Sequence, residues 1–124
     1  MHHVEQEQLQ AGLEDVRRSP GDEGPVELIV RRPAENEREV LEQGTLDVDD
    51  GLVGDAWRVR GSRGGPPNPD AQLTLMNARL AALVAGDREH WPLAGDQLYV
   101  DLDLGVENLP AGARLEIGEA IVEV

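Results

Sequence analysis

The chain of 124 residues contains no cysteine and no phenylalanine, and it has only three histidines. Without cysteine it can form no disulfide, and it offers no thiolate as a nucleophile or metal ligand. The histidines are too few for a zinc site of the ordinary type, since two of them stand at positions 2 and 3 and the third is His90. The hydrophobic core must be built from aliphatic side chains together with Trp57, Trp91 and Tyr99.

Lysine is absent as well, so all eleven basic residues are arginines, against 25 aspartates and glutamates. The net charge of −14 repels phosphate backbones and anionic lipids. We therefore predict no nucleic-acid partner and no membrane-surface partner. The arginines nevertheless cluster at 17–18, 31–32 and 58–63. Guanidinium forks suit carboxylates and phosphates, and solvated surface charge is the alternative interpretation of each cluster.

No apolar run approaches the length of a membrane span, and the start lacks the apolar region of a signal peptide. The sequence therefore predicts a cytoplasmic location. The length suits one domain.

Apolar periodicity predicts two helices, over 4–18 and 78–85, the second with Asn77 as its N-cap and Gly86 as its stop. Alternating apolar residues predict strands over 26–32, 38–46, 71–76, 97–104, 114–117 and 120–124. For the second of these, a helix over 35–42 is the competing interpretation, because glutamate, arginine and leucine are good helix formers. The last two strands read as a hairpin through Gly118-Glu119.

This count of short strands predicts a mainly β fold with two or three short helices. A small β-barrel, or a twisted and partly closed sheet with helices at its ends, fits the pattern. Residues 1–25 form an N-terminal helix and linker in this prediction, and residues 26–124 form the barrel domain.

Residues 46–77 hold the densest set of glycines, prolines and polar side chains in the chain. Loops of this length inside a compact domain are usually binding loops or disordered. Apolar runs flank this stretch on both sides, which favours a binding loop held by a scaffold.

Four segments together resemble the MOSC domain, the C-terminal domain type of molybdenum cofactor sulfurases. They are Asp-Gly-Leu-Val-Gly-Asp at 50–55, Gln-Leu-Thr-Leu at 72–75 before a helix, Trp-Pro-Leu-Ala-Gly-Asp-Gln-Leu at 91–98, and the hairpin at 109–124. The third departs from the family's Gly-Glu-Asn-Leu element, with Asp96 for glutamate and Gln97 for asparagine. The four stand in the family's order and cover about residues 26–124.

The resemblance implies a small β-barrel and the molybdenum cofactor, molybdopterin. It implies sulfur transfer to that cofactor or molybdenum-dependent reduction, with pyridoxal phosphate only in a cysteine desulfurase-type partner enzyme. A redox partner is the other class of partner that it implies. The family's active-site cysteine follows the closing hairpin, and this chain has none. We therefore expect the closing elements to be missing, the chain to be inactive alone, and the open edge to favour a homodimer.

The residues that this resemblance and their own chemistry single out for cofactor binding are Gly54, Asp55, Arg58, Arg60, Asp70, Gln72, Asn77 and Asp96. No catalytic residue and no metal ligand is predicted. Arginine forks suit the cofactor's phosphate, and mixed donors and acceptors suit a pterin edge. The alternative is structural: Asp55 caps local backbone, Asn77 is a helix cap, and Asp96 lies in the turn before a strand. The alternative function is a non-catalytic β-barrel that binds a small anion through residues 58–63, or a protein partner.

Overall fold

The computed structural model describes residues 6–34, 37–49, 51–55 and 72–124. At its centre is a four-stranded mixed sheet in the order β2-β1-β6-β5. Strand β1 pairs antiparallel with β2 and β6, whereas β5 runs parallel to β6. The bounds are β1 Val26–Arg31, β2 Glu39–Leu41, β5 Leu75–Asn77 and β6 Leu98–Val100.

Two further pairs of strands stand beside this sheet. Strands β3 (Leu46–Asp47) and β4 (Gly51–Leu52) form one antiparallel pair, and β7 (Arg114–Ile117) and β8 (Ala120–Glu123) form the other. The predicted hairpin at the end of the chain is confirmed. Its turn needs a positive φ at its first position, and Gly118 supplies one of +59°.

The helices are α1 (Gln6–Arg17), α3 (Ala78–Ala85) and the 3-10 helix η2 (Arg88–Ala94). The prediction of α3 is confirmed with both caps: Leu80 N donates to Asn77 Oδ1 at 2.9 Å, and Gly86 N donates to Ala82 O at 3.0 Å. The predicted first helix is confirmed over its described part.

Helix α1 packs against α3, and Gly12 lies at that contact. A Cβ atom there would come within 2.3 Å of Leu83 Cδ1. The glycine that weakens α1 in isolation therefore allows the two helices to approach closely.

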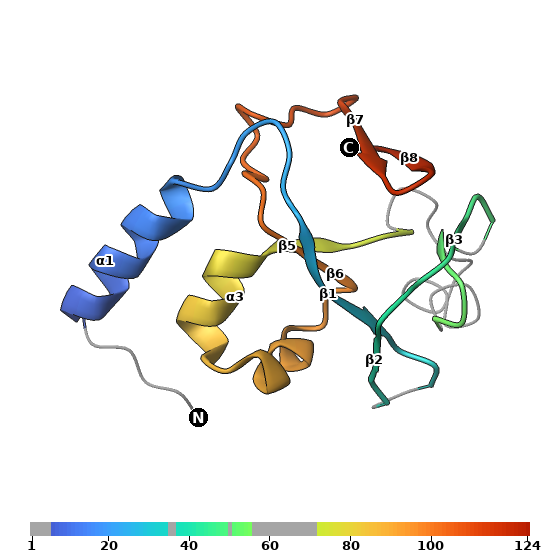
Figure 1. Ribbon diagram of the computed structural model, residues 1–124, viewed down its shortest axis with the longest axis horizontal. Helices are drawn as coiled ribbons and strands as arrows, with labels where there is room; N and C mark the ends of the chain where they lie inside the picture. Colours follow the sequence, from blue (N-terminus) through green and yellow to red (C-terminus); the bar gives the residue numbers. More distant parts are fainter. Residues whose placement is uncertain (1–5, 35–36, 50, 56–71) are drawn as a thin grey trace, which may run out of the picture.

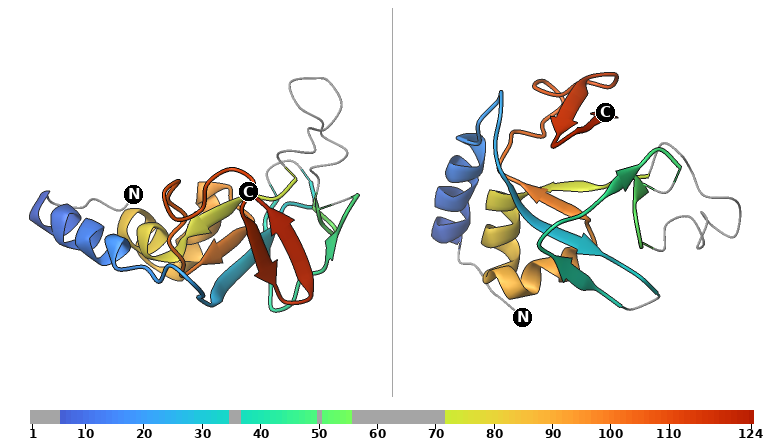
Figure 2. Two further views of the ribbon diagram at one scale, coloured as in Figure 1. Left: turned by 90° about the horizontal axis from the view of Figure 1, so that it is seen from above. Right: turned by 45° about the vertical axis from the view of Figure 1, so that its right-hand side comes forward.

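The central sheet buries a different apolar cluster on each face. Toward α3 and η2 lie Leu28, Val30, Ala78, Ala81, Trp91 and Tyr99. On the opposite face Leu98, Val100 and Leu102 pack with partly buried residues such as Ile29, Leu75 and Leu115. Helices α1 and α3 lie at one end of the molecule, and the hairpins β3–β4 and β7–β8 lie at the other (Figures 1 and 2).

The prediction of a mainly β small barrel is wrong. Helices and strands contribute about equal numbers of residues, and no sheet closes into a barrel within the described ranges. The predicted strand over 97–104 pairs only through Val100, because the next amides bond to the segment before β1. Asp101 N donates to Pro25 O, and Asp103 N donates to Pro20 O. The predicted strand over 38–46 is likewise divided between β2 and β3.

Among the described residues, no helix combines the length and the apolar character that a bilayer crossing requires.

Candidate functional site

A half-buried arginine connects two of the motifs that the sequence singles out. Arg32 donates from its backbone N to Asp55 Oδ1 at 2.6 Å, and its Nε and Nη2 reach the two oxygens of the same carboxylate at 3.2 Å. Its Nη1 donates to Gly95 O at 3.2 Å. The Asp55 side chain is 0% exposed and that of Arg32 is 19% exposed. Arg32 therefore holds the 51–55 segment and the 95–96 turn in one place.

Local sequence explains this arrangement. Pro33 ends β1 directly after Arg32, so the arginine stands where the strand leaves the sheet. Gly54 and Gly95 precede the two aspartates with φ values of +89° and +88°, which residues with a Cβ rarely adopt. A Cβ on Gly54 would also lie 2.5 Å from Arg31 Nη1. Both Gly-Asp turns therefore depend on their glycines.

Asp96 stands beside this bridge in a half-buried position. Burial raises the pKa of Asp96 above the ordinary value of 3.8, while the charge of Arg32 and a hydrogen bond from Thr74 lower it by less. The rest of the protein therefore does not fully offset the cost of burying the charged carboxylate of Asp96.

Gln97 is buried to 1% exposure next to Asp96. Its Oε1 accepts a hydrogen bond from Thr74 N at 2.8 Å. Its Nε2 is buried and has no hydrogen-bond partner among the described residues. A buried amide N–H without a partner costs about 1–3 kcal/mol, so an acceptor that reached this donor would stabilise the chain. We call Arg32, Asp55, Thr74, Asp96 and Gln97 the Arg32 cluster.

The structure divides the predicted site residues. Gly54, Asp55 and Asp96 belong to or adjoin the Arg32 cluster. Gln72 lies elsewhere, where its Nε2 donates to Val48 O at 2.5 Å. Asn77 caps α3 and donates to Ser19 Oγ and Leu102 O, at 2.8 and 2.9 Å. Arg58, Arg60 and Asp70 lie outside the described residues.

Two adjoining hollows border the β3–β4 hairpin. The sheet hollow, of about 760 Å³, is lined by residues that include Val26, Ile29, Gly44, Leu52, Leu98 and Ile117. The edge hollow, of about 1000 Å³, is lined by residues that include Gly51, Gln72, Leu73, Leu75, Leu109 and Val122. Leu46 and Ala120 border both hollows. Gln72 lines the edge hollow, and Asp96 is among the described lining residues of neither hollow.

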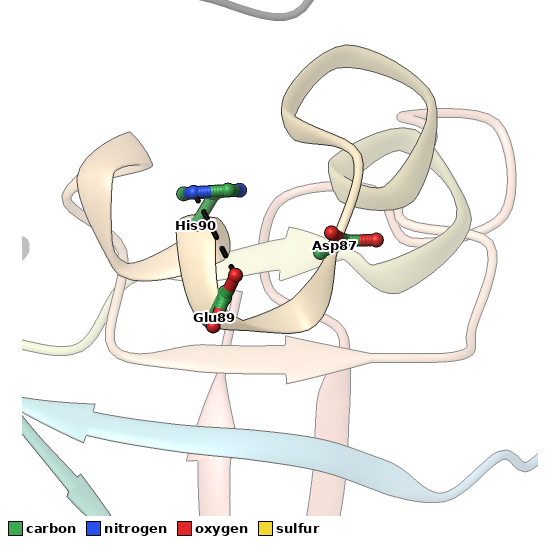
Figure 3. Close-up of side chains that lie close together, drawn as sticks. All are labelled: Asp87, Glu89 and His90. Atoms are coloured by element: carbon green, nitrogen blue, oxygen red, sulfur yellow. Dashed lines mark ion pairs between the residues drawn. The ribbon is translucent and has the colours of Figure 1, made fainter.

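One group of potential metal ligands lies at the surface around the start of η2. Asp87, Glu89 and His90 bring one ligand atom each within 4.8 Å of one another (Figure 3). All three residues are exposed, and His90 Nε2 lies 3.9 Å from Glu89 Oε1. Exposed acidic groups of this kind are common without a metal, so we assign no site here.

Trp91 and Tyr99 fix η2 over the sheet, as the prediction of a buried Trp91 requires. Tyr99 OH donates to Trp91 O at 2.8 Å, and Trp91 Nε1 donates to Gly86 O at 3.1 Å. Burial raises the pKa of Tyr99, and the charge of Asp96 adds to the rise. Tyr99 therefore remains a neutral structural donor near the Arg32 cluster.

Sequence reasoning did not place Arg32, Thr74 or Gln97 among the cofactor-binding residues, although it considered Gly95-Asp96-Gln97 as a loop on the cofactor side, with a turn before the next strand as the alternative. Arg32 was grouped with Arg31 as a surface pair. The sequence did contain a signal for Arg32. Pro33 ends the strand, so Arg32 stands just outside the alternating pattern of the strand.

Comparison of the chain with family models, with curated proteins and with solved structures gives no match. The likeness to the MOSC family therefore rests on the four motifs alone.

Two of the described residues carry hydrogen-bonding groups of the kind that one part of the molybdenum cofactor requires. A pterin edge carries N–H donors beside a carbonyl acceptor, and Asp96 and Gln97 offer the complementary acceptor and donor. They do not fit its metal end, because the chain has no thiolate. The arginines predicted for its phosphate lie outside the described residues.

Proposed function

We propose that this chain is a MOSC-like domain of the molybdenum-cofactor class, and that its Arg32 cluster holds the pterin end of the cofactor. The observation that carries this proposal is the unpartnered, buried Nε2 of Gln97 beside the half-buried carboxylate of Asp96. Both side chains lie next to the Gly-Asp turn that Arg32 fixes.

The chemistry of a pterin supports this assignment. Its amino and ring N–H groups point the same way, so one carboxylate accepts from both, and the neighbouring carbonyl accepts from an amide N–H. Accepting two hydrogen bonds would stabilise the charged form of Asp96, which burial alone disfavours. The ligand would therefore supply what both Asp96 and Gln97 lack.

Each residue of the Arg32 cluster has a role in this proposal. Asp96 accepts from the ligand, Gln97 donates to it, and Thr74 orients both through its hydroxyl and backbone N. Arg32 and Asp55 position the turn without touching the ligand.

The remaining chemistry of the family is assigned to other molecules. When bound, molybdopterin supplies the dithiolene that holds molybdenum. Sulfur transfer requires a thiolate, so in this proposal the thiolate and any pyridoxal phosphate belong to a partner enzyme. The proposal keeps the predicted cytoplasmic location.

The test uses free pterin as the probe and measures its affinity for the intact chain by isothermal titration calorimetry. Asp96→Asn and Gln97→Leu each remove one half of the complementary pair. We expect Asp96→Asn to weaken binding at least about tenfold, since a hydrogen bond to a charged group contributes about 1.5–3 kcal/mol.

Glu89→Gln is the matched control, because it removes a carboxylate from the exposed group at η2. Pterin should bind this variant as it binds the unchanged chain. Absence of pterin binding to the unchanged chain, or equal affinities of the Asp96→Asn and Glu89→Gln variants, would refute the assignment.

A further inference from the structure

Two strand edges without a neighbouring strand border the edge hollow. Strand β5 is the outer strand of the four-stranded sheet, and β8 pairs only with β7 among the described elements. Leu75 of β5 and all four residues of β8 line this hollow. Successive side chains of a strand point to opposite faces, so a hollow lined by consecutive residues faces the strand's edge.

The register of the hairpin identifies the free backbone groups of β8. Val124 N donates to Ala113 O at 2.8 Å, which places the amide of residue 124 toward β7. Antiparallel pairs alternate between hydrogen-bonded and non-hydrogen-bonded, so the amides of Ile121 and Glu123 point away from β7. Strand edges with unpaired groups of this kind accept an additional strand.

The side chains around the hollow fit an extended segment with apolar residues on one face. Partly buried leucines form its floor, and exposed apolar residues stand at its rim: Val48 is 89% exposed and Ile121 is 66% exposed. Among the described residues, the charged ones that line the edge hollow are Asp47 and Glu123, and those that line the adjoining sheet hollow are Glu42 and Glu119. No arginine lines either hollow within the described residues.

The charge argues against a second copy of this chain as the occupant. Its net charge is −14, so a second copy would bring more acidic groups against an acidic rim. An arginine- or lysine-bearing segment would pair with that rim. The two open strand edges favour an extended peptide over a small molecule, because the main chain of a peptide can form hydrogen bonds with both edges.

We propose that the edge hollow binds an extended, basic segment of a partner protein by β-strand addition, with its apolar side chains on the leucine floor and its basic side chains at the acidic rim. This surface lies apart from the Arg32 cluster. The proposal therefore stands or fails independently of pterin binding.

The probe is a blocked, fluorescently labelled octapeptide of alternating valine and arginine, and its binding is measured by fluorescence anisotropy. We expect it to bind the chain, and we expect an alternating valine–glutamate peptide not to bind. Proline at two central positions of the basic peptide should abolish binding, because proline removes main-chain donors. Amide hydrogen exchange should slow at Ile121, Glu123 and 75–77 when the basic peptide is bound.

The double variant Asp47→Lys, Glu123→Lys reverses both charges that line the edge hollow among the described residues, and it should weaken peptide binding about tenfold or more. Its matched control is Glu14→Lys, Glu107→Lys, which makes the same change in net charge at exposed positions outside both hollows. The control should bind within about twofold of the unchanged chain, because distant charges are screened by salt.

Four results would overturn the proposal. They are no binding of the basic peptide to the unchanged chain, an equal loss of affinity in both double variants, slowed exchange only outside the two strand edges, and a dimer of the chain alone that the rim reversal dissociates. The last would show that a second copy occupies the hollow.

Discussion

The bond between Arg32 and Asp55 is predicted to be the ion pair on which stability depends most. Asp55→Ala removes a carboxylate that is 0% exposed and accepts from both the backbone and the side chain of Arg32. What remains is an arginine that is 19% exposed, keeps its bond to Gly95 O and interacts electrostatically with the half-buried carboxylate of Asp96. Breaking a buried pair in this way costs about 3 kcal/mol.

A loss of that size is large against the 5–15 kcal/mol by which ordinary domains are stable. For a chain of this length it lowers the melting temperature by roughly 10–15 °C. The measurement is urea unfolding followed by circular dichroism, with a thermal melt as a second readout.

The neighbouring arginine provides a matched control. Arg31 pairs with Glu39 at 2.9 Å, but these side chains are 31% and 46% exposed. Arg31→Ala should therefore cost about 1 kcal/mol or less.

A double-mutant cycle separates the ion pair from other effects of each substitution. Adding Arg32→Met to Asp55→Ala removes the uncompensated charge, so the double variant should be roughly 2 kcal/mol more stable than the sum of the two single losses. Equal destabilisation by Arg31→Ala and Asp55→Ala, or strict additivity in the cycle, would refute the reasoning from burial.

Two other substitutions test the structural roles of predicted site residues. Asn77→Ala should lower the free energy of unfolding by about 2 kcal/mol, because it removes the α3 cap and two further hydrogen bonds. Pterin affinity should stay unchanged, and a loss of pterin affinity in a folded variant would contradict the cap assignment. Asp96→Asn should stabilise the chain at pH 7 and not below pH 3.8. Burial raises the pKa of Asp96, so the protonated form favours folding and that contribution is lost as the pH rises through the raised value. The check is a series of thermal melts across this pH range. A stability difference between the variant and the unchanged chain that does not vary with pH would disprove the prediction.

Local signals predicted the elements that depend on neighbours in sequence. The cap of α3 needs only Asn77 and an amide three residues on, and the hairpin needs only a glycine with positive φ between two short strands. Such interactions are encoded within a few residues, so periodicity and turn chemistry find them.

The fold class depended on pairings that periodicity does not encode. The alternation over 97–104 is as regular in its second half as in its first, yet the amides of Asp101 and Asp103 donate to the carbonyl oxygens of Pro25 and Pro20 instead of to a strand. The carboxylate of Asp101 pairs with Arg79 at 2.7 Å, which holds the segment against α3. An alternating pattern therefore indicates two faces, and it does not show that a partner strand is present.

The candidate site was predictable in its parts and not in its assembly. The two Gly-Asp turns pointed to Asp55 and Asp96, because positive-φ glycines before a polar residue mark built turns. The residue that unites them is 23 positions from Asp55 and 63 from Gly95, and no local rule spans that separation. Gln72, which sequence placed with them, is drawn to Val48 O on the other side of the hairpin.

The β3–β4 hairpin links the two proposed binding regions, because its residues contribute to both. Gly51 lines the edge hollow, Leu52 lines the sheet hollow, and Asp55 lies in the Arg32 cluster. Gly51 also lies against the backbone of Gln72, where a Cβ would come within 2.6 Å of the carbonyl oxygen. A strand of two residues cannot hold such a position by its own ladder, so the bond from Arg32 to Asp55 fixes the hairpin from its far end. The same ion pair that shapes the polar cluster therefore also sets one wall of the apolar hollows.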